Sequence, residues 1–123
     1  MYQLETVTAS LANNTPYTLT YQSSSQELGN FYTKNQTIAA GAEAAVFYAA
    51  GVGGGSDTGC EGAVVYNFTD GNGNTQSITL CYKDPFFGSN AFTVTCPSGM
   101  SGSANQPQGV SVVVTYTVGG SVD

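Results

Sequence analysis

The chain of 123 residues carries a net charge of −6 at pH 7, and Lys34 and Lys83 are its two cations. Two cations cannot neutralise a run of phosphates, so the composition excludes nucleic-acid binding. The sequence has no histidine, which excludes Ser-His-Asp and Cys-His catalytic centres and zinc sites built on histidine.

The beginning of the chain predicts two strands joined by a turn. Residues 6–12 alternate between apolar and polar side chains, as a half-buried strand does. Residues 13–16 contain two asparagines and a proline and predict a turn. Residues 17–21 alternate again, so we expect the first two strands to pair as a hairpin. Three serines at 23–25 then interrupt the pattern.

The middle of the chain predicts a short strand, a connection and a longer apolar strand. Residues 28–33 have the composition of a short strand, and 35–43 read as a connection anchored by Ile38. The apolar run 44–50 has strand length. Five glycines in residues 51–59 predict a loop with no regular structure.

The strongest local signal is a hairpin formed by residues 63–68 and 76–82. The Asp-Gly-Asn-Gly-Asn segment 70–74 between them is typical of a hairpin turn. The same segment begins like a calcium-binding loop. Such a loop, counted from Asp70, needs a glutamate at its twelfth position, and Cys81 stands there instead. We therefore favour the turn.

The last part of the chain predicts two more strands. Residues 83–90 and 97–109 read as loops, while 91–96 and 110–118 alternate as strands do. Seven or eight short strands with turns between them are typical of an antiparallel β-sandwich. We expect an all-β fold with a single domain over residues 1–123.

No spacing in the sequence selects a catalytic or metal-binding set. The eight acidic residues are scattered, mostly near predicted turns. We therefore expect a protein that is not an enzyme, with no catalytic residue, no metal site and no cofactor. The odd cysteine count leaves two alternatives open, three buried thiols or one disulfide with one free thiol, among Cys60, Cys81 and Cys96.

The segment from Tyr82 to Phe92 is rich in aromatic residues around a Pro-Phe-Phe-Gly turn. Phe86 and Phe87 are consecutive, so both cannot point easily into one core. In one interpretation, one ring is packed and the other caps the sandwich. In the other, the rings form an exposed apolar patch that contacts a membrane or a partner.

An ordered set of segments resembles the actinoporin-like cytolysins and the related aegerolysins. The set consists of IAAGAEAAVFY at 38–48, GAVVY at 62–66, DGN at 70–72, TLCY at 79–82 and SNAFTV at 89–94. Both families are β-sandwiches that recognise membrane lipids, above all sphingolipids. The small size and low isoelectric point are closer to an aegerolysin.

The resemblance implies a head-group site between the strand that begins Gly-Ala-Val and the aromatic loop. Phe86 is added from its place in the turn. The implied lipid-binding residues are Val64, Thr79, Cys81, Tyr82, Phe86 and Phe87.

The resemblance also implies partners and a location. The first predicted strand begins at Thr6, which leaves no counterpart of the actinoporin N-terminal helix, and the sequence has no tryptophan. Some aegerolysins act with a larger pore-forming protein. We therefore expect a sphingolipid-binding recognition subunit with such a partner. Residues 1–5 lack the features of a signal peptide, and we expect a secreted or leaderless extracellular protein, peripheral at its target membrane, with cytosolic storage as the alternative.

Two other functions remain open. Some fungal lectins share the actinoporin-like fold, so a carbohydrate-binding module with a glycan as partner is the first. The second is a structural or self-assembling β protein, because uncharged strands rich in Thr and Val could pair at their edges.

Overall fold

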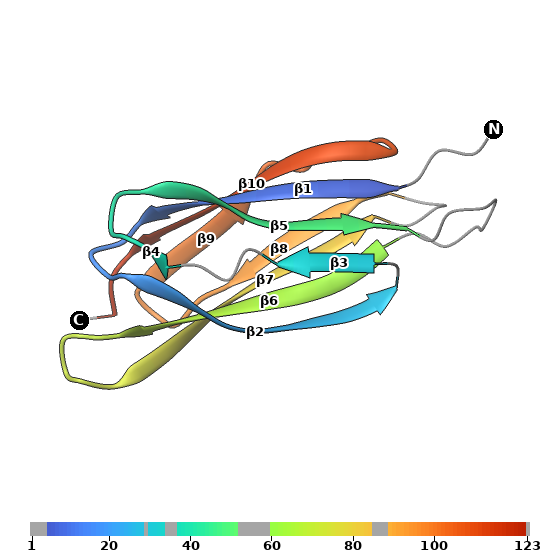
Figure 1. Cartoon of the computed structure of the whole chain (residues 1–123). Coiled ribbons are helices and arrows are strands. Elements are labelled where there is room, and N and C mark those ends of the chain that lie inside the picture. The colour runs from blue at the N-terminus through green and yellow to red at the C-terminus, as the bar shows by residue number, and fades with distance from the viewer. Residues whose placement is uncertain (1–4, 29, 34–36, 52–59, 85–88, 123) are drawn as a thin grey trace.

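A computed structural model describes residues 5–28, 30–33, 37–51, 60–84 and 89–122. They form ten β-strands in two sheets that face each other (Figure 1). The all-β sandwich expected from the sequence is confirmed. In the described part of the chain, there is no helix of the length and apolar character needed to cross a membrane.

Each sheet has five strands. The first sheet has the order β3 (Asn30–Thr33), β5 (Glu43–Ala50), β1 (Thr6–Asn14), β10 (Ser111–Gly120) and β9 (Met100–Ala104). The second sheet has the order β4 (Thr37–Ile38), β2 (Leu19–Leu28), β6 (Cys60–Thr69), β7 (Thr75–Asp84) and β8 (Ala91–Thr95).

The strands nearest the two ends of the chain are neighbours inside the first sheet. β1 and β10 pair in parallel from Thr6 opposite Ser111 to Asn14 opposite Gly119. The other pairs described are antiparallel. A parallel pair needs a long connection, and here the rest of the sandwich provides it.

The core lies between the sheets and follows from the alternation along each strand. Each strand turns every second side chain inward, and the large inward residues interlock across the gap. Phe47 of the first sheet lies 5.0 Å from Tyr82 of the second, measured between ring centroids. The Tyr116 hydroxyl donates a hydrogen bond of 2.7 Å to the Cys81 carbonyl oxygen, which links β10 to β7.

The predicted hairpin of the first two strands is wrong, because β1 and β2 belong to different sheets. The turn between them carries the chain across the sandwich. Asn13 is fully buried there, and its side-chain amide donates to the carbonyl oxygens of Tyr17 at 2.8 Å and Ile38 at 3.1 Å. Its side-chain oxygen accepts from the backbone N–H of Thr15.

Two other expectations were wrong. The serines at 23–25 do not end a strand, because β2 continues through them with shifts of register on both sides. The predicted loop 97–109 contains β9, which pairs with β10. Gly102 in β9 lies so close to the Val94 side chain that a Cβ would collide with it. The described residues thus form ten strands, more than expected.

The predicted hairpin of β6 and β7 is confirmed. The two strands pair without a shift from Cys60 opposite Asp84 to Thr69 opposite Thr75. The carboxylate of Asp70 accepts hydrogen bonds of 2.9 Å from the backbone N–H groups of Asn72 and Asn74 and from the Gln76 side chain. Its oxygens are therefore engaged by the turn itself.

Candidate functional site

A hollow of about 240 Å³ lies on the outer face of the second sheet, near the start of β6 and the end of β7. We call it the outer hollow. The following residues line it: Ser25, Glu61, Gly62, Ala63, Cys81, Tyr82, Lys83, Ala91 and Thr93.

The register of three strands builds this hollow from two rows of paired residues. One row places Cys81 between Ala63 and Thr93. The other row places Lys83 between Glu61 and Ala91. Directly paired residues lie on the same face of a sheet. Because several of these outward side chains are small, the longer ones at the edge stand above a depression.

The second of these rows sets the electrostatics of the hollow. Glu61 and Lys83 are opposite each other on neighbouring strands and carry opposite charges. Lys83 is exposed and is the one cation in the described part of the chain. The hollow thus offers one positive and one negative group, with apolar and hydroxyl groups between them. This arrangement is complementary to a zwitterion, which carries both charges within a few bonds.

Of the four predicted site residues that the structure describes, two line the outer hollow, Cys81 and Tyr82. Thr79 lies on the same face of β7, one outward position further along, and pairs with Val65 and Thr95. Val64 has no exposed surface and points into the core, so its side chain cannot form the floor of an open pocket.

Phe86 and Phe87 lie outside the described residues. Along the chain they follow the end of β7, which contributes to the outer hollow, within a few residues. Their role as lipid contacts stays a prediction.

Tyr82 lies mostly in the core and reaches the outer hollow beneath a glycine. Its ring is only 2% exposed and stacks on Phe31 with centroids 5.6 Å apart. A Cβ on Gly62 would lie 2.6 Å from both the Tyr82 hydroxyl and the Ser25 carbonyl oxygen. Gly62 therefore allows the tyrosine ring to extend below the floor of the hollow.

Sequence reasoning missed the charged pair and the small residues of the outer hollow. The signal was present in the predicted hairpin, whose turn is centred on Asn72. A turn fixes the register of the strands on both sides, and counting outward from this one places Glu61 opposite Lys83 and Ala63 opposite Cys81.

Two buried acids lie at the same end of the sandwich. Glu5 precedes β1 and is 5% exposed, and Asp84 ends β7 with no exposed surface. Burial, the hydrogen bond with Glu5 and the negative charge of Glu5 raise the pKa of Asp84 to about 8. Apart from the carboxyl of Glu5, no described N–H or O–H group donates to either oxygen of Asp84. At neutral pH, Asp84 therefore adds little negative charge behind the outer hollow.

The structure describes the side chains of two cysteines. Cys81 and Cys96 are both free, and burial raises the pKa of the Cys96 thiol. The side chain of Cys60 is outside the described part. No group of three or more His, Cys, Asp or Glu side chains comes together among the described residues.

A second hollow of about 430 Å³ lies at the other end of the same face, near the β6–β7 turn. Its described lining has no charged residue and consists of Thr18, Thr20, Asn67, Phe68, Thr69 and Thr75. We call it the threonine hollow. It lacks the charged pair that distinguishes the outer hollow.

Comparison with known proteins finds likeness in structure but not in sequence. No family model and no curated protein sequence matches the chain. The fold is similar to the RahU protein, solved with a TRIS molecule, with a TM-score of 0.67, 18% identity and coverage of 98% of this chain and 97% of that one.

Two further solved structures are similar. The lipid binding protein Nakanori has a TM-score of 0.71 and 17% identity, with coverage of 93% of this chain and 70% of that one. IP-1A from Alcaligenes faecalis has a TM-score of 0.61 and 15% identity, with coverage of 96% and 91%. These matches establish that the chain has the aegerolysin-like β-sandwich fold.

Proposed function

We propose that the protein binds membrane lipid, with the zwitterionic head group held in the outer hollow. The observation that carries this proposal is the pairing of Glu61 with Lys83 beside a small depression. Lys83 would face the phosphate, and Glu61 would face the quaternary ammonium. The likeness in fold to a protein described as lipid binding supports it.

We further propose that the preferred lipid is a sphingolipid. Its ceramide part carries an amide and a hydroxyl, which need hydrogen-bond partners at the membrane interface. Ser25 and Thr93, which line the outer hollow, offer hydroxyls for them. Phe86 and Phe87 would enter the interfacial zone beside the head group, as aromatic rings do.

In this proposal the protein acts by binding and breaks no covalent bond. It works at the outer surface of a target membrane, and a larger protein supplies any pore. We therefore expect binding to vesicles without release of their contents.

Co-sedimentation with vesicles tests the proposal. Phosphatidylcholine vesicles are compared with vesicles that also contain sphingomyelin or ceramide phosphoethanolamine, and encapsulated calcein reports leakage. We expect sphingolipid-dependent binding without calcein release. Absence of binding to every vesicle would refute lipid binding, and equal binding to all three would refute only the sphingolipid preference.

Variants then locate the site. Ala63→Phe fills the outer hollow from an outward position, and Lys83→Gln removes its cation; both should weaken vesicle binding about tenfold or more. Thr75→Phe fills the threonine hollow in the same way and should leave binding unchanged. The pair Phe86→Ala and Phe87→Ala should also lose binding while the fold is kept. Unchanged binding by Ala63→Phe would exclude the outer hollow.

A further inference from the structure

The outer face of the first sheet carries a single apolar row. In the described part of the chain, three large apolar side chains are exposed: Tyr32 at 61%, Tyr48 at 39% and Val113 at 65%. Tyr32 pairs with Tyr48, Tyr48 with Thr8, and Thr8 with Val113. The three therefore lie in one line across β3, β5, β1 and β10, which we call the tyrosine row.

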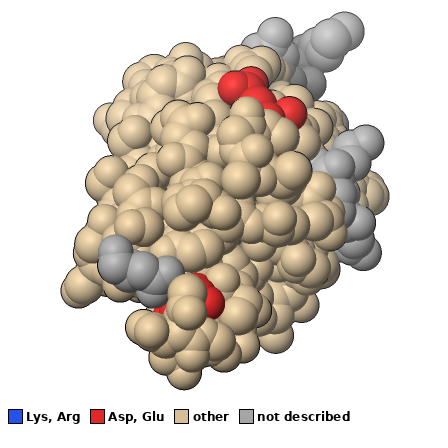
Figure 2. Space-filling model, turned by 90° about the vertical axis from the view of Figure 1, so that its left-hand side faces the viewer, with Lys and Arg blue, Asp and Glu red and all other residues tan. Residues whose placement is uncertain are grey.

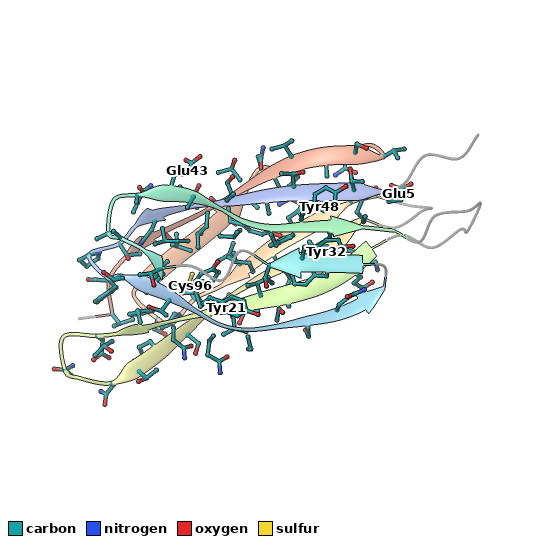
Figure 3. All side chains as sticks on the ribbon, in the orientation of Figure 1. Glu5, Tyr21, Tyr32, Glu43, Tyr48 and Cys96 are labelled. Atoms are coloured by element: carbon teal, nitrogen blue, oxygen red, sulfur yellow. The ribbon has the colours of Figure 1, made fainter. Side chains whose placement is uncertain are left out.

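The two tyrosines form a shallow platform. Their rings are stacked, with centroids 6.2 Å apart and planes 29° apart, and Figure 3 shows them next to each other on β3 and β5. The neighbouring rows are small. Ser10 lies between Ala45 and Thr115 on one side, and Thr6 pairs with Ser111 on the other. The platform is thus bordered by hydroxyl groups.

The tyrosine row has no charge of its own. Its four residues and those of the two neighbouring rows include no acid or base among the described side chains. The exposed acid of this sheet, Glu43, pairs with Ala12, two rows from Tyr48. A charged ligand would lose its hydration here without gaining a counter-charge, so the face suits an uncharged one.

The area of the row is too small to hold a second copy of the chain. The exposed parts of Tyr32 and Tyr48, 61% and 39%, together equal one fully exposed tyrosine, or about 150–250 Å². Val113 and Thr8 are smaller residues and are only partly exposed, so they do not double this area. A stable dimer buries about 800 Å² on each partner. The row matches the footprint of a small ligand instead.

The hydroxyl groups on both sides also keep this face out of the hydrocarbon layer of a bilayer. Thr6, Ser10 and Thr115 would leave water with the tyrosines, and lipid tails offer them no hydrogen bonds. A sugar ring can both contact the tyrosine rings and form hydrogen bonds with the neighbouring hydroxyl groups. One side of a pyranose carries C–H groups that pack on an aromatic face, and its rim carries hydroxyls that donate and accept.

We propose that the tyrosine row binds a neutral oligosaccharide, with a sugar ring stacked on Tyr32 and Tyr48. The hydroxyls of Thr8, Ser10 and Thr6 bond the rim of the ring, and Val113 contacts the next sugar. The site lies on the opposite sheet from the outer hollow, so lipid and sugar would bind independently.

Saturation-transfer NMR on the full chain tests this proposal with lipid-free probes. The panel consists of lactose, maltotriose, cellotriose and triacetylchitotriose at millimolar concentration. We expect transfer to the ring C–H protons of at least one sugar. Tyr32→Ala and Tyr48→Ala should each weaken that affinity about five- to tenfold, and Tyr32→Phe and Tyr48→Phe, which keep the ring, should stay within about twofold.

Controls separate the alternatives. Tyr21→Ala removes a ring from the second sheet and should bind sugar normally, as should the Ala63→Phe variant of the outer hollow. Circular dichroism verifies that each variant is folded. The proposal is overturned if no sugar of the panel shows transfer, or if both alanine variants bind as the wild type does. It is also overturned if those variants keep sugar binding and instead lose vesicle binding, or lose any self-association that the wild type shows.

Discussion

The buried side chain of Asn13 stabilises the segment where the chain passes from one sheet to the other. Its amide reaches the carbonyl oxygens of Tyr17, Ile38 and Ala39, and its oxygen accepts from both the N–H and the hydroxyl of Thr15. Asn13→Ala leaves these buried groups without partners, which should lower the free energy of unfolding by about 3 kcal/mol. The exposed neighbour provides the control, because Asn14→Ala should change it by less than about 0.5 kcal/mol. Urea denaturation of both variants measures the difference, and equal losses would contradict the role of Asn13.

The raised pKa of Asp84 predicts the sign of a pH dependence. In the folded protein the pKa is about 8, against 3.8 for a free aspartate, so folding favours the protonated form. The resulting stabilisation is complete below about pH 4 and is lost as the pH rises towards 8. Asp84→Asn removes this titration. We expect the wild type to lose stability between pH 4.5 and 7.5 more steeply than the variant.

Urea denaturation at several pH values within this range measures both slopes. Asp70 titrates in the opposite sense, since the hydrogen bonds from Gln76, Asn74 and Asn72 lower its pKa. The stability that ionised Asp70 contributes to the fold is present above its ordinary pKa. It is lost only as the pH falls through the lowered pKa, below the range tested. Parallel slopes for wild type and Asp84→Asn would show that Asp84 is ionised in the folded protein.

At the scale of elements, the β6–β7 hairpin depends on one glycine of its turn. Gly73 has a φ of +81°, and a Cβ at this position would meet no atom within 4 Å, so the requirement for glycine is conformational. Gly73→Ala should lower the free energy of unfolding by about 1 kcal/mol. Gly71 of the same turn does not have a positive φ, and Gly71→Ala should be neutral or slightly stabilising. Thermal unfolding of the two variants compares them, and equal midpoints would refute the argument.

The elements that the sequence predicts correctly are those whose evidence is local. The β6–β7 hairpin has its turn residues between two alternating segments, so one stretch of sequence indicates both strands and their pairing. The pairing of β1 with β10 joins opposite parts of the chain, and no short-range pattern encodes it. β9 was missed because it is a Gly/Ser-rich edge strand of Met100–Ala104, held by backbone hydrogen bonds that any residue except proline can make.

The predictions for the candidate site also depend on whether the evidence is local or requires the strand register. Cys81 and Tyr82 were predicted from the sequence as lipid-binding residues, and both line the outer hollow. Val64 was included among the lipid-binding residues because motif resemblance gives a position along a strand, whereas the face is decided by register. In β6, Val64 falls on the inward face and Ala63 on the outward one. A shift of one residue exchanges core and surface.

For the molecule as a whole, the net charge of −6 decides which membranes it can approach. Among the described residues at the end of the sandwich that carries the β6–β7 turn, Figure 2 shows two small acidic areas and no basic side chain. Attraction to an anionic membrane comes from clustered Lys and Arg, and here Lys83 is the one cation in the described part. We therefore expect any membrane affinity to come from short-range contacts and not from long-range attraction.

This charge predicts the response to anionic lipid. A surface rich in phosphatidylserine has a potential of about −30 mV or more, which repels a protein of negative net charge. Replacing part of the phosphatidylcholine by phosphatidylserine, at constant sphingomyelin, should weaken co-sedimentation about threefold or more. Added salt shortens the screening length from about 10 Å at 0.1 M to about 3 Å at 1 M, and should restore binding. Stronger binding to phosphatidylserine, lost in salt, would instead show that the Lys83 region governs the approach to the membrane.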